Sequence, residues 1–121
     1  MQWHINWGHI EEWLMSLDDD TYTQVRAAFT LLAEEGPQLG RPLVDSVTAS
    51  RHKNMKELRP GSSGRSEIRI LFAFDPRRAA IMLFAGDKSG QWKRWYRKAI
   101  PIADQLFDQH IATIKKGRKQ R

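Results

Sequence analysis

The segment RSEIRILFAFDPRRAAIMLFAG, residues 65–86, carries the clearest structural signal in the chain. Two apolar runs flank DPRR, in which proline occupies the second position of a turn, so the segment predicts a β-hairpin. Side chains alternate between the two faces of a strand. In the first strand, 65–75, this alternation places Ile68, Ile70, Phe72 and Phe74 on one face and Arg65, Glu67 and Arg69 on the other.

Upstream of the hairpin, the sequence predicts one strand followed by two helices. Apolar and polar residues alternate over 3–7, which indicates a short strand with one buried face. Helical spacing follows, first over 10–17 and then from Tyr22 to the stop signal at Gly36 and Pro37. Asp18, Asp19 and Asp20 close the first helix and cap the second, so the two helices form a hairpin.

The remaining segments complete a small α+β fold. Residues 36–50 predict an ordered loop, 53–60 (KNMKELRP) a strand, and 60–64 (PGSSG) a flexible turn. Residues 86–98 predict a polar, aromatic and basic link, and Pro101 suits the first turn of a helix with an apolar stripe to Ile114. We therefore expect a small twisted antiparallel sheet with an N-terminal helical hairpin and a C-terminal helix. Residues 1–116 would form a single domain and 117–121 a disordered basic tail.

Size and charge narrow the function. The 121 residues suit one domain, and 20 Lys and Arg against 14 Asp and Glu give a net charge of +6. A pI near 10.0 favours a polyanionic partner, with nucleic acid ahead of a membrane surface. The chain has no cysteine, no long apolar run and no signal-peptide pattern at its start, which predicts a soluble cytoplasmic protein.

Several kinds of catalytic site lack their sequence signals. The histidines at 4, 9, 52 and 110 have no metal-ligand spacing, so neither a metal site nor a cofactor is predicted. His110 falls in the apolar stripe of the last helix, where a histidine with a satisfied hydrogen bond in the core is expected. GSSG has neither the spacing nor the lysine of a phosphate-binding loop.

Basic residues are instead dense around the predicted sheet. If the strands are neighbours, the following residues converge on one surface: Lys53, Lys56, Arg59, Arg65, Arg69, Lys88, Lys93, Arg94, Tyr96 and Arg97. Arginine binds phosphate bidentately, aromatic residues such as Trp92, Trp95 and Tyr96 can stack on bases, and Glu67 could orient Arg65 and Arg69. A solvated face with ordinary surface charges, and tryptophans that belong to the core, form the alternative interpretation.

A basic surface with a tyrosine suits RNA cleavage. RNA supplies its own nucleophile, the 2′-hydroxyl, so the enzyme needs only to move protons and stabilise the phosphorane charge. Lysine, arginine and tyrosine can do this if like charges crowd together and lower a lysine pKa.

Several motifs together resemble the HigB-like branch of the RelE/ParE superfamily of bacterial and phage toxins. The resemblance rests on EEGPQLGRP (34–42), MKELRP (55–60), RILFAFDPRRAAIML (69–83), GDKSG (86–90) and IPIAD (100–104). It implies a RelE-like fold and a bacterial or prophage-encoded type II toxin that cleaves mRNA on the ribosome. The implied partners are the ribosome with its mRNA and a cognate antitoxin of the HigA type, which would form a hetero-oligomer with the toxin and often doubles as a DNA-binding repressor; no membrane partner is implied.

The same resemblance implies roles for individual residues. Arg69 and Lys88 would stabilise the phosphate and the transition state, and Tyr96 would stack on or contact the substrate near the scissile bond. Lys56 would be the general base, although RelE proteins carry a lysine pair where this chain has Lys56-Glu57-Leu58. Two other functions stay open at this point: inhibition of DNA gyrase, as by ParE toxins, and RNA binding without chemistry.

Overall fold

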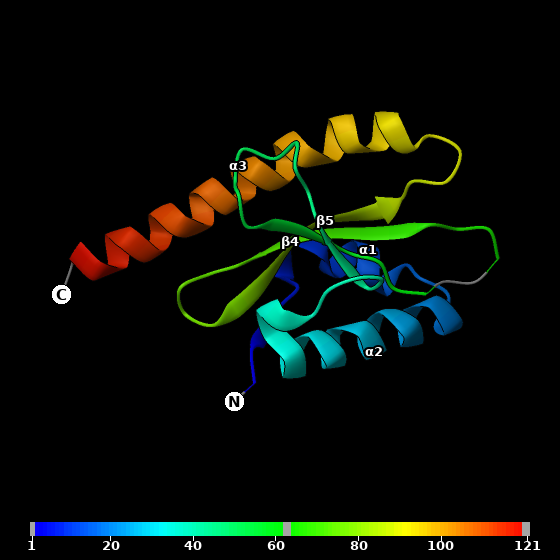
Figure 1. Ribbon diagram of the computed structural model, residues 1–121, viewed down its shortest axis with the longest axis horizontal. Coiled ribbons are helices and arrows are strands. Elements are labelled where there is room, and N and C mark those ends of the chain that lie inside the picture. Colours follow the sequence, from blue (N-terminus) through cyan, green and yellow to red (C-terminus); the bar gives the residue numbers. More distant parts are fainter. Residues whose placement is uncertain (1, 62–63, 120–121) are drawn as a thin grey trace.

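A five-stranded sheet runs through the centre of the computed structural model, which describes residues 2–61 and 64–119 (Figure 1). Its strands are β1 (His4–Asn6), β2 (Val44–Ser46), β3 (Met55–Leu58), β4 (Ile68–Phe74) and β5 (Ala79–Asp87), in the order β1-β5-β4-β3-β2. Strand β1 pairs with β5 in parallel, and all other neighbours are antiparallel. The predicted α+β class is therefore confirmed. Ser62 and Ser63 of the predicted PGSSG turn lie outside the described residues.

The predicted hairpin is present as β4 and β5. Leu71 pairs with Phe84 and Phe72 with Met82, so Leu83 is an extra residue that bulges β5. The predicted apolar face is confirmed, since its four members pack in one core cluster: Ile68, Ile70, Phe72 and Phe74.

The predicted charged face of β4 is wrong. Arg65 lies in a turn and Glu67 lies just before the strand, so only Arg69 belongs to β4. Leu71 and Ala73 continue the face of Arg69, and both are fully buried. These two positions are apolar because they pack under the C-terminal helix, so this face of the strand carries no charged residue after Arg69.

Two helices cover one face of the sheet. Helix α1 (Glu11–Met15) continues a 3₁₀ turn at Gly8–Ile10, and α2 (Asp19–Glu35) leads into a second 3₁₀ turn at Gly36–Gln38. As predicted, the Asp18 carboxylate caps α2 by accepting a hydrogen bond of 3.0 Å from the Thr21 N–H. Gly36 ends α2 with φ +61°, and a Cβ there would lie 2.4 Å from the Trp3 Nε1 atom.

Helix α3 (Trp92–Lys119) covers the opposite face and starts earlier than the sequence indicated. Pro101, predicted to begin the helix, lies inside it, where the missing N–H removes a bond to the Arg97 carbonyl. Burial of an apolar row against β4 and β5 offsets that loss: Trp95, Ala99, Ala103 and Phe107. Residues 117–119 of the predicted tail continue the helix, while residues 120 and 121 lie outside the described part of the chain.

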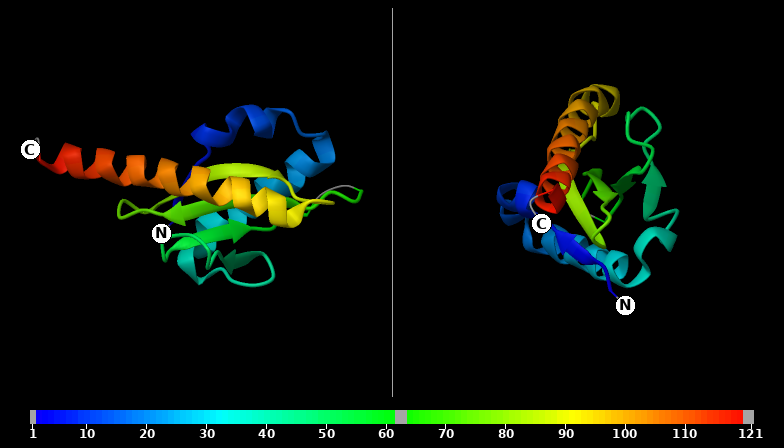
Figure 2. Two further views of the ribbon diagram at one scale, coloured as in Figure 1. Left: turned by 90° about the horizontal axis from the view of Figure 1, so that it is seen from above. Right: turned by 90° about the vertical axis from the view of Figure 1, so that its left-hand side faces the viewer.

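The result is a sheet between two helical layers (Figure 2). The C-terminal end of α3 extends beyond the edge of the sheet, and its N-terminal end lies beside the end of β5. Strand β2 lies within the segment predicted as a loop. Its three residues pair with β3 at the sheet edge, and three residues are too few to show a periodic pattern in the sequence. Across the described residues, no helix has both the length and the apolar content that a membrane span requires.

Candidate active site

A buried carboxylate, Glu57, lies at the centre of the basic residues. Met55 and Glu57 point from β3 toward α3, whereas Lys56 and Leu58 point toward α2. Glu57 is 5% exposed. Its Oε1 accepts a hydrogen bond of 2.5 Å from the Tyr96 hydroxyl, and its Oε2 accepts bonds of 2.8 and 3.2 Å from Arg59. Two elements far apart in the sequence, β3 and α3, are thereby joined.

Arg69 is the second cation beside this carboxylate. Glu57 pairs with Leu71 of β4, so Arg69 is its diagonal neighbour on the same face. The Arg69 Nε atom lies 3.9 Å from Glu57 Oε1, and Nη1 donates to the Ile68 carbonyl at 2.8 Å. Within the described residues, Nε is buried and has no hydrogen-bond partner. An unused buried donor of this kind is uncommon in folded proteins and points to a functional role.

Lys88 completes the site from the end of β5. Its side chain is 14% exposed, and its Nζ lies 3.1 Å from Glu67 Oε2. The same Nζ is 5.7 Å from the ring centre of Trp92 and 5.9 Å from that of Tyr96. We refer to Glu57, Arg59, Arg69, Lys88 and Tyr96 together as the Glu57 cluster.

Electrostatics in the Glu57 cluster favour hydrogen-bond donation by Tyr96. Burial raises the pKa of Tyr96 well above its ordinary value, the bond to Glu57 acts in the same direction, and Arg69 opposes both. The hydroxyl therefore stays protonated at neutral pH. The hydrogen bond to Glu57 raises the pKa of Arg59, which also donates to Asp45 Oδ2 at 3.1 Å. Cations alternate with carboxylates here, so the crowding of like charges expected from the sequence is not found.

The structure brings four of the predicted site residues together and separates the others. Arg59, Arg69 and Tyr96 meet around Glu57, and Lys88 lies next to them, with its Nζ 5.9 Å from the centre of the Tyr96 ring. Lys56, predicted as the base, lies on the opposite face of the sheet and lines a hollow there with residues 37–41. The prediction of one converging surface is wrong for Lys56, because adjacent residues of a strand face opposite ways.

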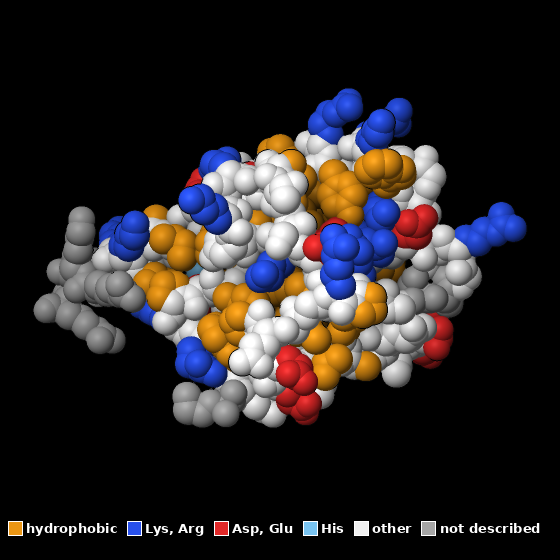
Figure 3. Space-filling view, in the orientation of Figure 1, with side chains coloured by type: hydrophobic (Ala, Val, Ile, Leu, Met, Phe, Trp, Pro, Cys, Tyr) orange, Lys and Arg blue, Asp and Glu red, His pale blue; other side chains and the backbone are white. Residues whose placement is uncertain are grey.

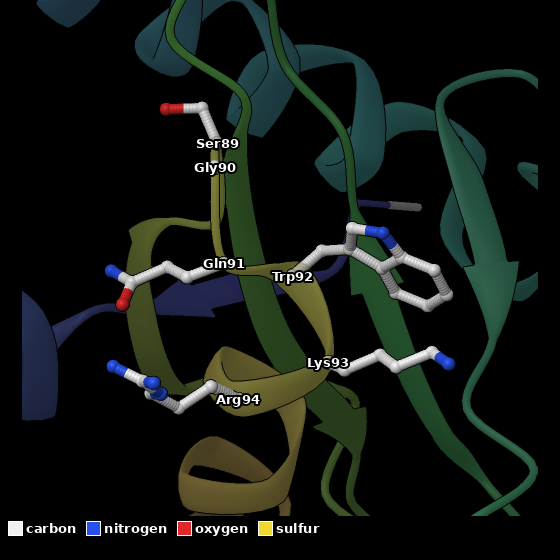
Figure 4. A pocket seen from close by; sticks show the side chains of 6 residues that line it. All are labelled: Ser89, Gly90, Gln91, Trp92, Lys93 and Arg94. Carbon is white, nitrogen blue, oxygen red and sulfur yellow. The ribbon is translucent and has the colours of Figure 1, made fainter.

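The predicted RNA-binding residues lie around the periphery. Lys53 and Arg65 are exposed in turns that precede β3 and β4. Lys93 and Arg94 begin α3 and line a hollow of about 460 Å³ with residues 89–92, and their side chains leave the helix on opposite sides (Figure 4). Trp92 and Lys93 share one of these sides.

Two further predictions concern orienting and core residues. Glu67 pairs with Lys88 rather than with Arg65 or Arg69, so the carboxylate beside Arg69 is Glu57, which sequence reasoning missed. The alternation of Met55, Glu57 and Arg59 could have signalled it. His110 is satisfied as expected, because its Nε2 lies 2.7 Å from the Oδ2 atom of buried Asp75. Trp95 is a core residue, whereas Trp92 is 54% exposed.

One face of the protein carries a patch in which basic and hydrophobic side chains are mixed. Lys and Arg side chains gather there next to hydrophobic ones, over the N-terminal end of α3 and the neighbouring strands (Figure 3). Acidic side chains interrupt the basic patch rather than surround it. Cationic and aromatic groups side by side are what single-stranded nucleic acid requires.

The fold, together with the basic cluster between its inner strands and α3, defines an α+β protein of the RelE-like class. The chain belongs to the family described as "Phage derived protein Gp49-like (DUF891)", whose match covers residues 12–108. It is 56% identical over 119 residues to "Putative toxin HigB2" and 53% identical over 108 residues to "Putative toxin HigB3", both of Mycobacterium tuberculosis.

These alignments cover 98% and 89% of the chain, respectively. The chain spans 59% of the length of HigB2 and 92% of that of HigB3. The resemblance to HigB-type proteins is thus confirmed. No solved structure matches the chain.

Proposed function

We propose that this protein is the toxin of a type II toxin–antitoxin system and acts as a ribosome-dependent mRNA endonuclease. The observation that carries the proposal is Arg69, whose buried Nε donor has no partner in the described chain and lies 3.9 Å from Glu57 Oε1, the same atom that accepts from Tyr96. The Arg69 side chain is 17% exposed, so a phosphate can reach its guanidinium and, after a local rearrangement, accept from that donor as well. The names of the two mycobacterial relatives support the toxin assignment.

In the proposed reaction, the 2′-oxygen of one nucleotide forms a bond to the adjacent phosphorus as it loses its proton. The bond from phosphorus to the 5′-oxygen breaks, and that oxygen takes up a proton, which leaves a 2′,3′-cyclic phosphate and a 5′-hydroxyl. Negative charge grows on the non-bridging oxygens, where Arg69 and Lys88 stabilise it. Tyr96 stays protonated and therefore contacts the substrate as a donor or through its ring. Lys56 receives no role, because it faces the other side of the sheet.

Glu57 would position the catalytic groups. One buried carboxylate fixes the Tyr96 hydroxyl and the Arg59 guanidinium and lies 3.9 Å from Arg69. Groups fixed in advance in this way lose little freedom when the substrate binds. Because Glu57 is almost fully buried, it cannot leave the cluster to make room, so the phosphate must approach from the side of Arg69 and Lys88.

The proposal includes a cognate antitoxin of the HigA type that covers or distorts the Glu57 cluster. Neutralisation requires a block of the site, and an acidic antitoxin segment would suit its partly buried cations and the exposed Lys93 and Arg97 beside them. A structure of the complex in which the cluster is open and unchanged would contradict this part of the proposal.

The test is a primer-extension map of a reporter mRNA in a reconstituted translation system. Cuts should require ribosomes and fall about 10²- to 10³-fold in rate in Arg69→Ala and Lys88→Ala, as expected for removal of one transition-state donor. Arg77→Ala is the matched control, since it removes an exposed arginine in the turn between β4 and β5, at the other end of the hairpin from the cluster. Intact mRNA and unimpaired translation would refute the proposal, and a supercoiling assay with purified gyrase would then test the ParE-type alternative.

A further inference from the structure

An apolar hollow adjoins the Glu57 cluster and has no role in the chemistry described above. It measures about 440 Å³ and lies between α3 and the loop that joins β2 to β3. Trp92, Tyr96 and Ile100 form its floor on successive turns of the helix, and Ala49 of the loop lies opposite them. Tyr96 belongs to both the hollow and the cluster, so a molecule could occupy the two at once.

Polar contacts fix the loop wall of the hollow to the next two turns of α3. Asp104, 4% exposed, accepts hydrogen bonds from the Ser50 hydroxyl at 2.5 Å and the Arg51 N–H at 3.3 Å. Asp108 binds the Arg51 guanidinium, and its Oδ1 lies 2.7 Å from His52 Nε2. The hollow is therefore held open by the fold rather than formed by a loose loop.

Cations border the hollow. Lys93 and Arg97 form the row beside Trp92 and Tyr96 on α3, and both are exposed. The ammonium groups of Lys88 and Lys93 lie 5.7 and 5.8 Å from the ring centre of Trp92. A flat apolar surface with cations at its rim suits a ligand that has a flat ring and a phosphate next to it.

We propose that this hollow binds one unpaired base of the RNA strand whose phosphate lies at Arg69 and Lys88. This inference rests on the proposed function, which supplies the position of that phosphate. The base stacks on Trp92 and Tyr96, and the neighbouring phosphates contact Lys93 and Arg97. Trp92 is thus an RNA-binding residue, and this role accounts for the 54% exposure of so large an apolar side chain.

The test is an abasic scan by fluorescence anisotropy at one low ionic strength, since salt alone changes affinity for nucleic acid. The probes are 2′-O-methyl hexamers of adenosine and of uridine, which cannot be cleaved, and versions that lack one base at each position. For the wild-type chain, we expect loss of one particular base to weaken binding about 5- to 150-fold, the range for one base stacked on an aromatic ring. Trp92→Ala should weaken the intact hexamer equally and remove the effect of that abasic position.

Two control variants test whether the change in affinity belongs to the hollow. Met15→Ala removes an apolar side chain that is 61% exposed and remote from the hollow, and it should leave binding unchanged. Ala49→Trp fills the hollow from the exposed loop and should act like Trp92→Ala, with an unchanged circular dichroism spectrum.

Two outcomes would overturn the inference: an abasic scan with no sensitive position, or failure of both intact hexamers to bind. Retained RNA affinity together with lost antitoxin binding in Trp92→Ala and Ala49→Trp would also overturn it and would make the hollow a protein-docking site. None of these measurements depends on cleavage. If no abasic position weakens binding but ribosome-dependent cuts vanish in Arg69→Ala, the base site is refuted and the proposed function stands. If one abasic position weakens binding but the protein cleaves no mRNA, the base site stands and the proposed function is refuted.

Discussion

Replacement of Glu57 by alanine should destabilise the protein strongly, although the site contains more cations than carboxylates. The change removes the acceptor of Tyr96 and leaves Arg69, 17% exposed at its side chain, without a carboxylate within 4 Å in the described chain. Loss of one partner of a buried ion pair costs about 3–5 kcal/mol, because the remaining charge stays buried without compensation. Arg59 adds little to this, since its side chain is 34% exposed and Asp45 still accepts from it.

The expected loss is a large share of the stability of a domain of this size, which is typically about 5–15 kcal/mol. The midpoint of thermal unfolding should fall by about 10–20 °C. Glu57→Gln should cost less, about 1.5–3 kcal/mol, because the amide oxygen can still accept from Tyr96 while the charge is lost. Urea denaturation followed by circular dichroism measures both changes as free energies of unfolding.

Two matched variants decide whether the buried charge is the cause. Glu67→Ala removes a carboxylate that is 49% exposed and pairs with Lys88, and it should cost only about 0–1 kcal/mol. The double variant Glu57→Leu with Arg69→Met replaces the pair by apolar groups and should recover most of the cost of Glu57→Ala. If Glu57→Ala costs under about 1 kcal/mol, or if the double variant is as unstable as the single one, the assigned role of Glu57 is refuted.

Three other predictions concern pH, packing and the loop. Burial, and then the bond to Glu57, raise the pKa of Tyr96 in the folded state, so the contribution of this residue to stability is complete below about pH 10, the pKa of an unfolded tyrosine. Above that pH the tyrosine ionises in the unfolded state only, and the free energy of unfolding should fall by about 1.4 kcal/mol per pH unit. Alkaline denaturation curves should lose this component in Tyr96→Phe, and an unchanged slope would contradict the assignment. Gly86→Ala places a Cβ 2.5 Å from Nε1 of buried Trp95 and should lower the free energy of unfolding by about 1–3 kcal/mol, as measured by thermal denaturation. Gly40→Ala is the control, because a Cβ there meets open space and the change should be nearly neutral. Asp104→Ala removes the acceptor for the Ser50 hydroxyl and the Arg51 N–H and should lower the free energy of unfolding by about 1–3 kcal/mol. Amide hydrogen exchange should become faster over residues 47–54. Protection equal to that of the wild type would show that Asp104 does not fix this loop to α3.

The elements that local patterns could predict were those with a strong period or a clear stop signal. The 68–74 and 79–87 strands follow from two apolar runs around a turn, and α2 follows from its apolar spacing, its Asp18 cap and Gly36. Strand β2 and the first turns of α3 could not be predicted in this way. Three edge residues have no period, and Pro101 looks like a start signal although the helix continues through it.

The sequence by itself determined the excess of positive charge, the hairpin, the apolar face of β4 and the four residues Arg59, Arg69, Lys88 and Tyr96 as site candidates. Only the tertiary structure decided that Glu57 joins them and that Lys56 does not. Alternation along β3 shows that these two adjacent residues face opposite ways, but which face meets α3 depends on packing between elements far apart in the chain. The bond between Tyr96 and Glu57 spans 39 residues, so no local pattern contains it; it forms because a buried carboxylate must find donors wherever the fold brings them.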